Sequence, residues 1–308
     1  MALAPVFRRT ILAAAHSPRI NAWVRRHGMR LGAARFVAGE NLDACVPVLR
    51  RLNARGLKAN TTLLGEAVGD ETVARAVVEQ YVEILNRLAA ERLHCNVALK
   101  LTHLGLDAGM EVAYRHVRRL VEHAAGLSNF IRMDMEESSR VDATLAIYRR
   151  LRAAGYDNVG VVLQSYLYRS EADLTGLLPL RPNLRIVKGA YLEPPTVAYP
   201  RKADVDRNYL RLAERALREA GYTAVATHDE RLIEHVIEFA AREGIGRDRF
   251  EFQMLYGVRP QLQIELVRRG YTVLVATPFG RDWYPYFMRR LAERPANVLF
   301  VLRNLLRS

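Results

Sequence analysis

A lysine followed by residues with small side chains forms the stretch of this sequence most suited to binding a ligand. Residues 184–187, apolar except for Arg185, predict a short strand, and a Lys-Gly-Ala run at positions 188–190 comes directly after it. Small residues after a strand allow a ligand to approach the backbone closely, and glycine also tolerates a positive φ. Tyr191 and Glu193 return polar side chains to the same strand end. On its own, the stretch is equally consistent with an ordinary turn that carries a solvated lysine.

Other apolar stretches also end in polar or small residues. These ends are Lys100, Asp134, Gln164, Thr227-His228, Gln253 and residues 276–280. A lysine in such a place is consistent with a Schiff-base amine, an anion ligand or a solvated strand end. Asp134 can contact a cationic amine, ligate a metal or cap the next helix. The amide of Gln164 needs hydrogen-bond partners where it is buried. Thr227 and His228 can bind a phosphate or a polar ring edge, or serve the fold alone.

Arg289 and Arg290 form an adjacent pair near the C-terminus. Their forked donors match the planar geometry of a carboxylate or a phosphate. Neighbouring residues of a helix diverge by about 100°, so both reach one ligand only if the helix lies across the mouth of a barrel. Glu293 lies within four residues of both and is expected to ion-pair with either. A solvated face of arginine and glutamate is the alternative.

The elements that must position these residues alternate along the chain. Strands are predicted at residues 57–64, 94–101, 129–135, 158–164, 184–187, 222–228, 250–255 and 271–276. Helices are predicted at residues 70–92, 109–124, 136–154, 170–178, 203–220, 229–243, 260–270, 283–293 and 297–307. Asp70 is an expected helix cap, and so is Ser138 or Ser139.

This alternation predicts the fold class. Eight strand–helix units with short loops are typical of a distorted (β/α)8 barrel of the TIM type, which we place at residues 40–308 as a single domain. An open doubly wound sheet is the alternative, but its usual G-x-G-x-x-G turn does not follow the first strand. The site of a barrel lies where its strands end, so the polar residues named above are predicted to meet there.

Composition restricts the partners and the compartment. The 308 residues carry a formal net charge of +13, which favours anionic ligands or an anionic membrane surface. Nucleic acid is not an expected partner, because the arginines are spread along many helices rather than gathered on one face. Cys45 and Cys95 have neither metal-binding nor redox spacing, so we predict no metal site and a reducing, cytoplasmic compartment. No apolar run is long enough to cross a bilayer.

Residues 1–39 are rich in arginine and contain no acidic residue. They predict a pair of cationic amphipathic helices. This N-terminal helical segment is expected to pack on the body of the protein, as such helices usually do. Peripheral contact with the inner face of the membrane is the alternative.

Taken in order, these residues resemble a known family. The chain resembles proline dehydrogenase, the flavin-dependent enzyme of proline catabolism, in its monofunctional bacterial form. Over residues 35–306 several short motifs occur in the order of that family. They are Leu64-Gly65-Glu66, Lys100, Arg132-Met133-Asp134-Met135-Glu136, Gln164, Arg185-Ile186-Val187-Lys188-Gly189-Ala190-Tyr191, Thr227-His228, Gln253-Met254-Leu255-Tyr256-Gly257, and Arg289-Arg290 with Glu293. Each motif is weak alone, but together, in order and at barrel strand ends, they are specific.

The resemblance implies FAD held noncovalently, and oxidation of L-proline to 1-pyrroline-5-carboxylate by hydride transfer to N5 of the flavin. Electrons would then pass to membrane quinone. The implied FAD contacts are Met135, Gln164, Arg185, Val187, Lys188, Gly189, Ala190, Thr227 and His228. The implied substrate pocket consists of Lys100, Ala276, Arg289, Arg290 and Glu293 together with the implied catalytic residues Asp134, Arg185 and Tyr191. In this arrangement the arginine pair holds the substrate carboxylate, while Asp134 and Tyr191 flank the ring nitrogen.

The sequence departs from the family at one loop. The family pattern Tyr-x-Pro-x-Gly reads Ala-Thr-Pro-Phe-Gly at residues 276–280. Ala276 thus replaces a tyrosine that packs against the substrate ring, which predicts relaxed selectivity toward 4-hydroxyproline. A Schiff-base aldolase that uses Lys100 on the same fold is the other activity considered. Such an enzyme would be colourless, and borohydride would trap it with a carbonyl substrate.

Overall fold

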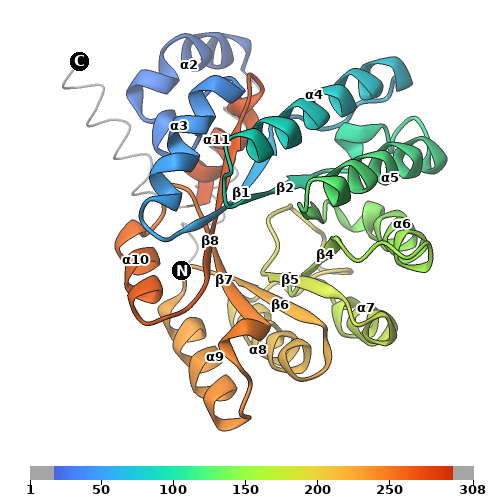
Figure 1. The fold of residues 1–308 in the computed structure, drawn as a ribbon, viewed down its shortest axis with the longest axis vertical. Coiled ribbons are helices and arrows are strands. Elements are labelled where there is room, and N and C mark those ends of the chain that lie inside the picture. Colours follow the sequence, from blue (N-terminus) through green and yellow to red (C-terminus); the bar gives the residue numbers. More distant parts are fainter. Residues whose placement is uncertain (1–16, 294–308) are drawn as a thin grey trace.

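Eight parallel strands close into a barrel. The computed structural model describes residues 17–293, and within them each strand pairs with the next in sequence, while the last closes on the first (Figure 1). The strands are β1 (Lys58–Leu63), β2 (Cys95–Leu99), β3 (Ile131–Met133), β4 (Val159–Gln164), β5 (Asn183–Val187), β6 (Tyr222–Ala226), β7 (Phe250–Leu255) and β8 (Val273–Phe279). The prediction of a (β/α)8 barrel is confirmed.

Helices follow the strands in alternation. They are α4 (Glu71–Ala90), α5 (Met110–Gly126), α6 (Val141–Ala153), α7 (Ser170–Leu177), α8 (Lys202–Glu219), α9 (Glu230–Arg242), α10 (Pro260–Arg268) and α11 (Trp283–Glu293), with α2 (Pro18–Leu31) and α3 (Leu42–Asn53) before β1. Single turns of 3-10 helix are η1 (Ala33–Arg35), η2 (Thr102–Leu104), η3 (Ser138–Arg140), η4 (Leu178–Leu180) and η5 (Arg247–Arg249). The predicted cap at Asp70 is confirmed, because its side chain accepts a hydrogen bond from the Val73 N–H at 3.0 Å.

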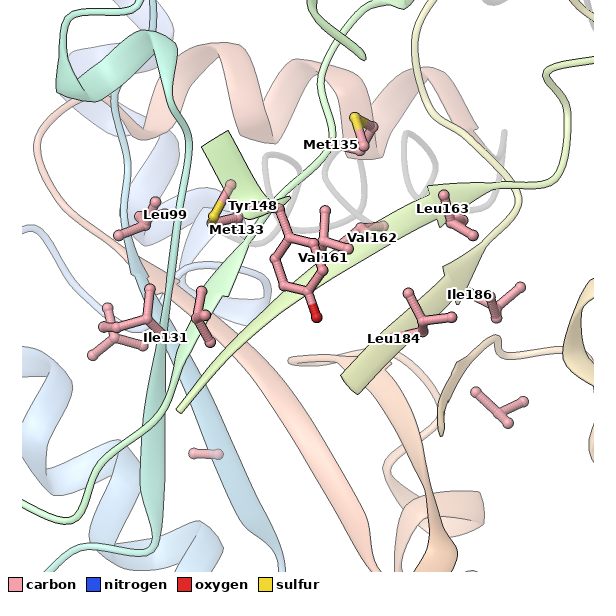
Figure 2. Close-up of a cluster of buried hydrophobic side chains, with 14 of the residues drawn as sticks. Leu99, Ile131, Met133, Met135, Tyr148, Val161, Val162, Leu163, Leu184 and Ile186 are labelled. Atoms are coloured by element: carbon pink, nitrogen blue, oxygen red, sulfur yellow. The ribbon is translucent and has the colours of Figure 1, made fainter. Parts of the chain in front are cut away.

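Side chains alternate along the strands between two faces. The outer face of the barrel is apolar and is covered by the helices, while the inner face is more polar. Ile131 and Met133 of β3 and Val161 of β4 belong with Tyr148 of α6 to one buried cluster (Figure 2). Successive side chains of a strand point to opposite faces, so Arg132 faces the interior of the barrel. Its guanidinium passes over Gly160 of β4, where a Cβ atom would lie 2.3 Å from Arg132 Nη1, and donates to the carbonyl of Asn183 on β5 at 2.8 Å.

The last helix departs from the regular barrel pattern. The place outside β1 and β8 is taken by α3, which packs against both strands. Helix α11 packs instead against α2, and Figure 1 shows α2, α3 and α11 together on the side where β1 meets β8. Trp283 and Phe287 of α11 form a second buried cluster with Phe36, and Gly28 of α2 lies so close that a Cβ there would be 2.7 Å from the Trp283 ring.

Two predicted boundaries are wrong by three residues or more. Helix α6 begins at Val141 rather than at residue 136, and neither Ser138 nor Ser139 caps it with a side chain. Strand β8 continues past Ala276 to Phe279, so residues 276–279 are strand rather than loop. Beyond Ala276 this strand pairs only with β1, and Pro278 is therefore tolerated, since an edge position does not require its missing N–H.

The expected helix at residues 297–307 and the first part of the N-terminal segment, residues 1–16, lie outside the described residues. Among the helices of residues 17–293, none combines the length and the apolar character needed to cross a membrane.

Candidate active site

A cavity of about 710 Å³ opens at the carboxyl ends of the strands. The predicted site residues that line it are Lys100, Asp134, Met135, Gln164, Arg185, Val187, Lys188, Gly189, Ala190, Tyr191, Thr227, His228, Ala276, Arg289 and Arg290. The structure thus brings together around one cavity residues that are far apart in the sequence. Only Glu293 is not placed, because its side chain lies outside the part of the chain that is described.

Arg185 crosses the cavity floor from β5. Its Nη1 donates to Asp134 Oδ1 at 2.6 Å, and its Nη2 donates to Asn60 Oδ1 of β1 at 2.9 Å. Asp134 does not cap the next helix, because α6 and the turn η3 before it have other N-cap residues and no side-chain cap. Arg185 Nε is also buried, and no acceptor for it exists within residues 17–293. A buried donor without a partner is costly, so this N–H is suited to a bound ligand.

One end of the cavity is cationic. Arg289 donates to Glu66 Oε1 at 3.2 Å, and Lys100 forms an ion pair with the other oxygen of the same carboxylate. Burial opposes ionisation of Glu66, but the charges of Lys100 and Arg289 outweigh it and hold the pKa of Glu66 below its ordinary value. The guanidinium of Arg290 lies 5.1 Å from the centre of the Tyr286 ring. Helix α11 therefore presents both arginines to one cavity. This agrees with the expectation for a helix that lies across the barrel mouth.

Tyr191 remains a neutral phenol at neutral pH. Burial, followed by the negative charges of Glu136 and Glu137, raises the pKa of Tyr191 above its ordinary value. Its hydroxyl is therefore able to donate a hydrogen bond into the cavity. Glu193, two residues further on, does not line the cavity. Its carboxylate instead accepts from the N–H and the hydroxyl of Ser138, both at 2.7 Å, and so ties the loop after β5 to the loop after β3.

The turn after β5 has the backbone geometry that its glycine permits. Gly189 has a φ of +113°, and a Cβ atom there would lie 2.2 Å from the ring of Tyr166. Lys188 is not a solvated lysine, because its Nζ lies 2.6 Å from Asp206 Oδ1 and 3.6 Å from Asp229 Oδ2. These ion pairs hold the lysine at the cavity wall.

The remaining polar groups of the cavity lie after β6 and β7. The Leu255 N–H donates to His228 Nε2 at 2.9 Å, so the neutral ring carries its proton on Nδ1. Thr227 Oγ1 accepts from the Asp229 N–H at 3.1 Å. Arg259 donates to the His228 carbonyl at 3.1 Å and pairs with Glu230 at 2.5 Å. This end of the cavity thus combines a fixed imidazole with cationic side chains.

A buried histidine supports the turn that carries Glu66. A Cβ atom on Gly65 would lie 2.2 Å from His103 Nε2, so the ring packs directly on this turn. His103 is 6% exposed, and its Nδ1 has no hydrogen-bond partner among the residues described. Burial first, and then the charge of Lys100, lower the pKa of His103 to about 4.

This histidine is expected to make the fold acid-sensitive. Between about pH 6.5 and pH 4 the unfolded chain binds a proton at His103 and the folded chain does not, so stability rises with pH across this window. The free energy of unfolding should fall by up to about 3 kcal/mol on acidification. Urea unfolding at pH 7 and pH 4.5 should show a smaller loss in His103→Gln than in the wild type. Equal losses in the two proteins would contradict this role.

Several residues at or behind the cavity wall were not assigned to the site from the sequence. Among them are Asn60, Glu66, Lys202, Arg231, Arg259 and Tyr286. Glu66 follows β1 within a family-like motif, which was the available signal. Tyr286 precedes Arg289 by three residues and so shares its helix face. For Asn60 the sequence offered only a weak indication, an amide side chain within a predicted strand.

Comparisons with known proteins agree with this geometry. Residues 45–303 match the family model described as proline dehydrogenase. Proline dehydrogenase of Deinococcus radiodurans is 43% identical over 307 residues, covering 98% of this chain and 99% of that protein. Proline dehydrogenase 2 of Bacillus subtilis is 41% identical over 286 residues, covering 93% and 94%.

A solved structure is similar as well. Proline utilization A from Bdellovibrio bacteriovorus, inactivated by N-propargylglycine, has a TM-score of 0.81 at 25% identity over 88% of this chain. The match covers 33% of that protein, so this chain corresponds to about one third of the longer polypeptide.

Proposed function

Because the chain belongs to the proline dehydrogenase family, we propose that it oxidises L-proline to 1-pyrroline-5-carboxylate with FAD as its cofactor. The observation that carries the proposal is the charge pattern of one cavity. Arg289 and Arg290 stand on α11, while Asp134 and Tyr191 line the same space. Guanidinium groups suit a carboxylate, and a carboxylate and a phenol suit an amine, so the cavity matches both ends of an amino acid.

The cavity wall also fits FAD. Gln164 donates from Nε2 to the carbonyls of Met135 and Glu136, which leaves its Oε1 buried and without a donor in the described structure. Gln253 Oε1 is likewise buried and has no donor in the described structure. Such acceptors suit the N–H and hydroxyl groups of a flavin and its ribityl chain.

The opposite end of the cavity suits the cofactor phosphates. Lys188, Lys202, Arg231 and Arg259 line it, and cations of this kind bind phosphate. Bound FAD would supply N5 as the hydride acceptor and would return the electrons to membrane quinone. We propose that Met135, Gln164, Arg185, Val187, Lys188, Gly189, Ala190, Thr227 and His228 hold this cofactor.

The protein's own residues have to bind and orient the substrate. The arginine pair would hold the carboxylate, and the proline amine must be neutral before its neighbouring carbon loses a hydride. Asp134 Oδ1 already accepts from Arg185, so the second oxygen of this carboxylate is the one suited to the ring nitrogen. The Tyr191 hydroxyl would donate to the same nitrogen in its neutral form. Positioning and electrostatics are therefore the tasks of these side chains.

The aldolase alternative has no support from the surroundings of Lys100. A Schiff-base lysine must be neutral to attack a carbonyl carbon. Lys100 instead forms an ion pair with Glu66, which engages its amino group. Lys100 is better suited to hold an anionic group or to orient Glu66.

One experiment tests the proposal. The purified protein should be yellow, and L-proline should bleach the flavin absorbance in the absence of oxygen. A colourless protein that binds no added FAD, or a yellow protein whose absorbance proline leaves unchanged, would overturn it. Glycine serves as the control compound, because it lacks the ring carbon that must lose the hydride.

The cavity next to Ala276 predicts the selectivity of the reaction. Ala276 lines the cavity, whereas Phe279 and Tyr284 are buried away from it and do not fill the space that a tyrosine would take. We expect a small ratio of kcat/KM for proline over trans-4-hydroxyproline, and we expect Ala276→Tyr to enlarge it. Contacts of this kind contribute roughly 1–3 kcal/mol. Steady-state kinetics on both substrates measure the ratio.

The control for this prediction is Ala226→Val, which also narrows the cavity but from β6. It should leave the selectivity ratio near that of the wild type. An unchanged ratio in Ala276→Tyr would contradict the role of this position.

We also propose a cytoplasmic protein that makes weak peripheral contact with the membrane, because its electrons would go to quinone. The cationic residues 1–39 are the expected contact. Co-sedimentation with anionic vesicles should occur at low salt and fall as salt screens the charges. Binding that is absent at low salt, or that also occurs with neutral vesicles, would count against it.

A further inference from the structure

The guanidinium of Arg185 spans the interior of the barrel. In a closed barrel of eight strands, β5 and β1 lie opposite each other. Arg185 of β5 nevertheless donates from Nη2 to Asn60 Oδ1 of β1 at 2.9 Å, while its Nη1 donates at 2.6 Å to Asp134, which directly follows β3. The side chain is therefore held from two other strands at once.

Asn60 is itself fixed in place. It is 1% exposed, and it is not part of the cavity wall. Because arginine has only donors, the atom of Asn60 that faces it must be the oxygen. The amide nitrogen then donates to Asn96 Oδ1 of β2. This chain of hydrogen bonds ties the arginine to β1 and, through Asn96, to β2.

Two fixed acceptors determine the plane of a guanidinium, whereas one acceptor allows it to pivot. We propose that Asn60 is a positioning residue that holds the plane of Arg185 at the cavity floor. The inference rests on the proposed function, in which Arg185 contacts the cofactor. Arg185 Nε is buried and has no acceptor in the described chain. With Nη1 and Nη2 held by their acceptors, the Nε–H would point toward the ligand.

A fixed cation beside the cofactor has a consequence for the reaction. A positive charge held close to the flavin favours the uptake of negative charge on reduction. Loss of Asn60 should therefore lower kcat rather than raise KM, because the arginines expected to hold the substrate carboxylate are on α11. The absorbance spectrum of bound FAD should change as well, since it reports the charges around the ring.

The test compares Asn60→Leu with the same substitution at another buried asparagine. Asn208 of α8 is 4% exposed and donates to the Ser165 carbonyl at 2.7 Å, but it does not line the cavity. Both Asn60→Leu and Asn208→Leu should lower the melting temperature. Only Asn60→Leu should lower kcat, by about tenfold as for a lost hydrogen bond to a charged group, with KM little changed and an altered FAD spectrum.

A second variant covers the case in which leucine prevents folding. Asn60→Ser keeps a polar atom in the strand but is too short to reach Arg185, so the same loss of kcat and the same spectral change are expected. Wild-type kcat and spectrum in a folded Asn60 variant, or changes equal to those of Asn208→Leu, would overturn the proposal. A wild-type protein that proline fails to bleach would contradict the proposed function instead, and the spectrum of bound FAD would still report on Asn60.

Discussion

We expect Arg289→Met and Arg290→Met each to raise KM for proline by about tenfold or more, while the FAD content stays near that of the wild type. Both side chains line the cavity from α11, at the end that also contains Lys100. Removing one charge-assisted hydrogen bond to a carboxylate costs roughly 1.5–3 kcal/mol, which corresponds to the expected change in binding. Steady-state kinetics and the ratio of flavin to protein absorbance measure the two quantities.

Arg259→Met is the matched control for this pair. Arg259 lines the other end of the same cavity, where it bonds the His228 carbonyl and Glu230. Its loss should reduce FAD content and leave KM for proline nearly unchanged in the molecules that retain flavin. Near-normal proline kinetics in either α11 variant would remove that arginine from the substrate pocket.

Gly189→Ala should weaken FAD binding by at least about tenfold. The residue has a φ of +113°, which alanine adopts only with strain of order 1–3 kcal/mol. The new methyl group would also lie 2.2 Å from the ring of Tyr166, which is buried and cannot easily move. The turn must therefore shift, and with it the backbone that lines the cavity. Titration of the apoprotein with FAD gives the dissociation constant.

Gly176→Ala provides the comparison for this change. Gly176 lies in α7, where an added Cβ would meet only the end of the Arg149 side chain at 3.3 Å. Alanine favours helix there, so stability should be unchanged or slightly higher and FAD binding unaffected. Tight FAD binding by Gly189→Ala would show that this turn does not contact the cofactor.

The sequence predicts the barrel well because its signals are local. Several of the buried parallel strands are short apolar runs, such as residues 158–164, and each outer helix has its own periodic pattern. The candidate site follows from the same signals, since the ends of the strands must meet at one mouth. Lys100, Asp134 and Gln164 were found in this way.

The missed features depend on contacts between distant segments. Asn60 belongs to the site only because an arginine reaches it from the opposite strand. Ser138 could have capped a helix by its sequence position, but its N–H and hydroxyl bond to Glu193 of another loop. Strand β8 extends past Ala276 because β1 continues to pair with it there. Local patterns do not contain these pairings.

The closure of β8 on β1 affects how the site arises during synthesis. Asn60 leaves the ribosome more than a hundred residues before Arg185, and Arg289 follows a further hundred residues later. A nascent chain therefore contains separate parts of the cavity floor, and it lacks the arginine-bearing end of the cavity until α11 has been made. During vectorial synthesis the complete cavity can form only after both β1 and α11 are available to fold.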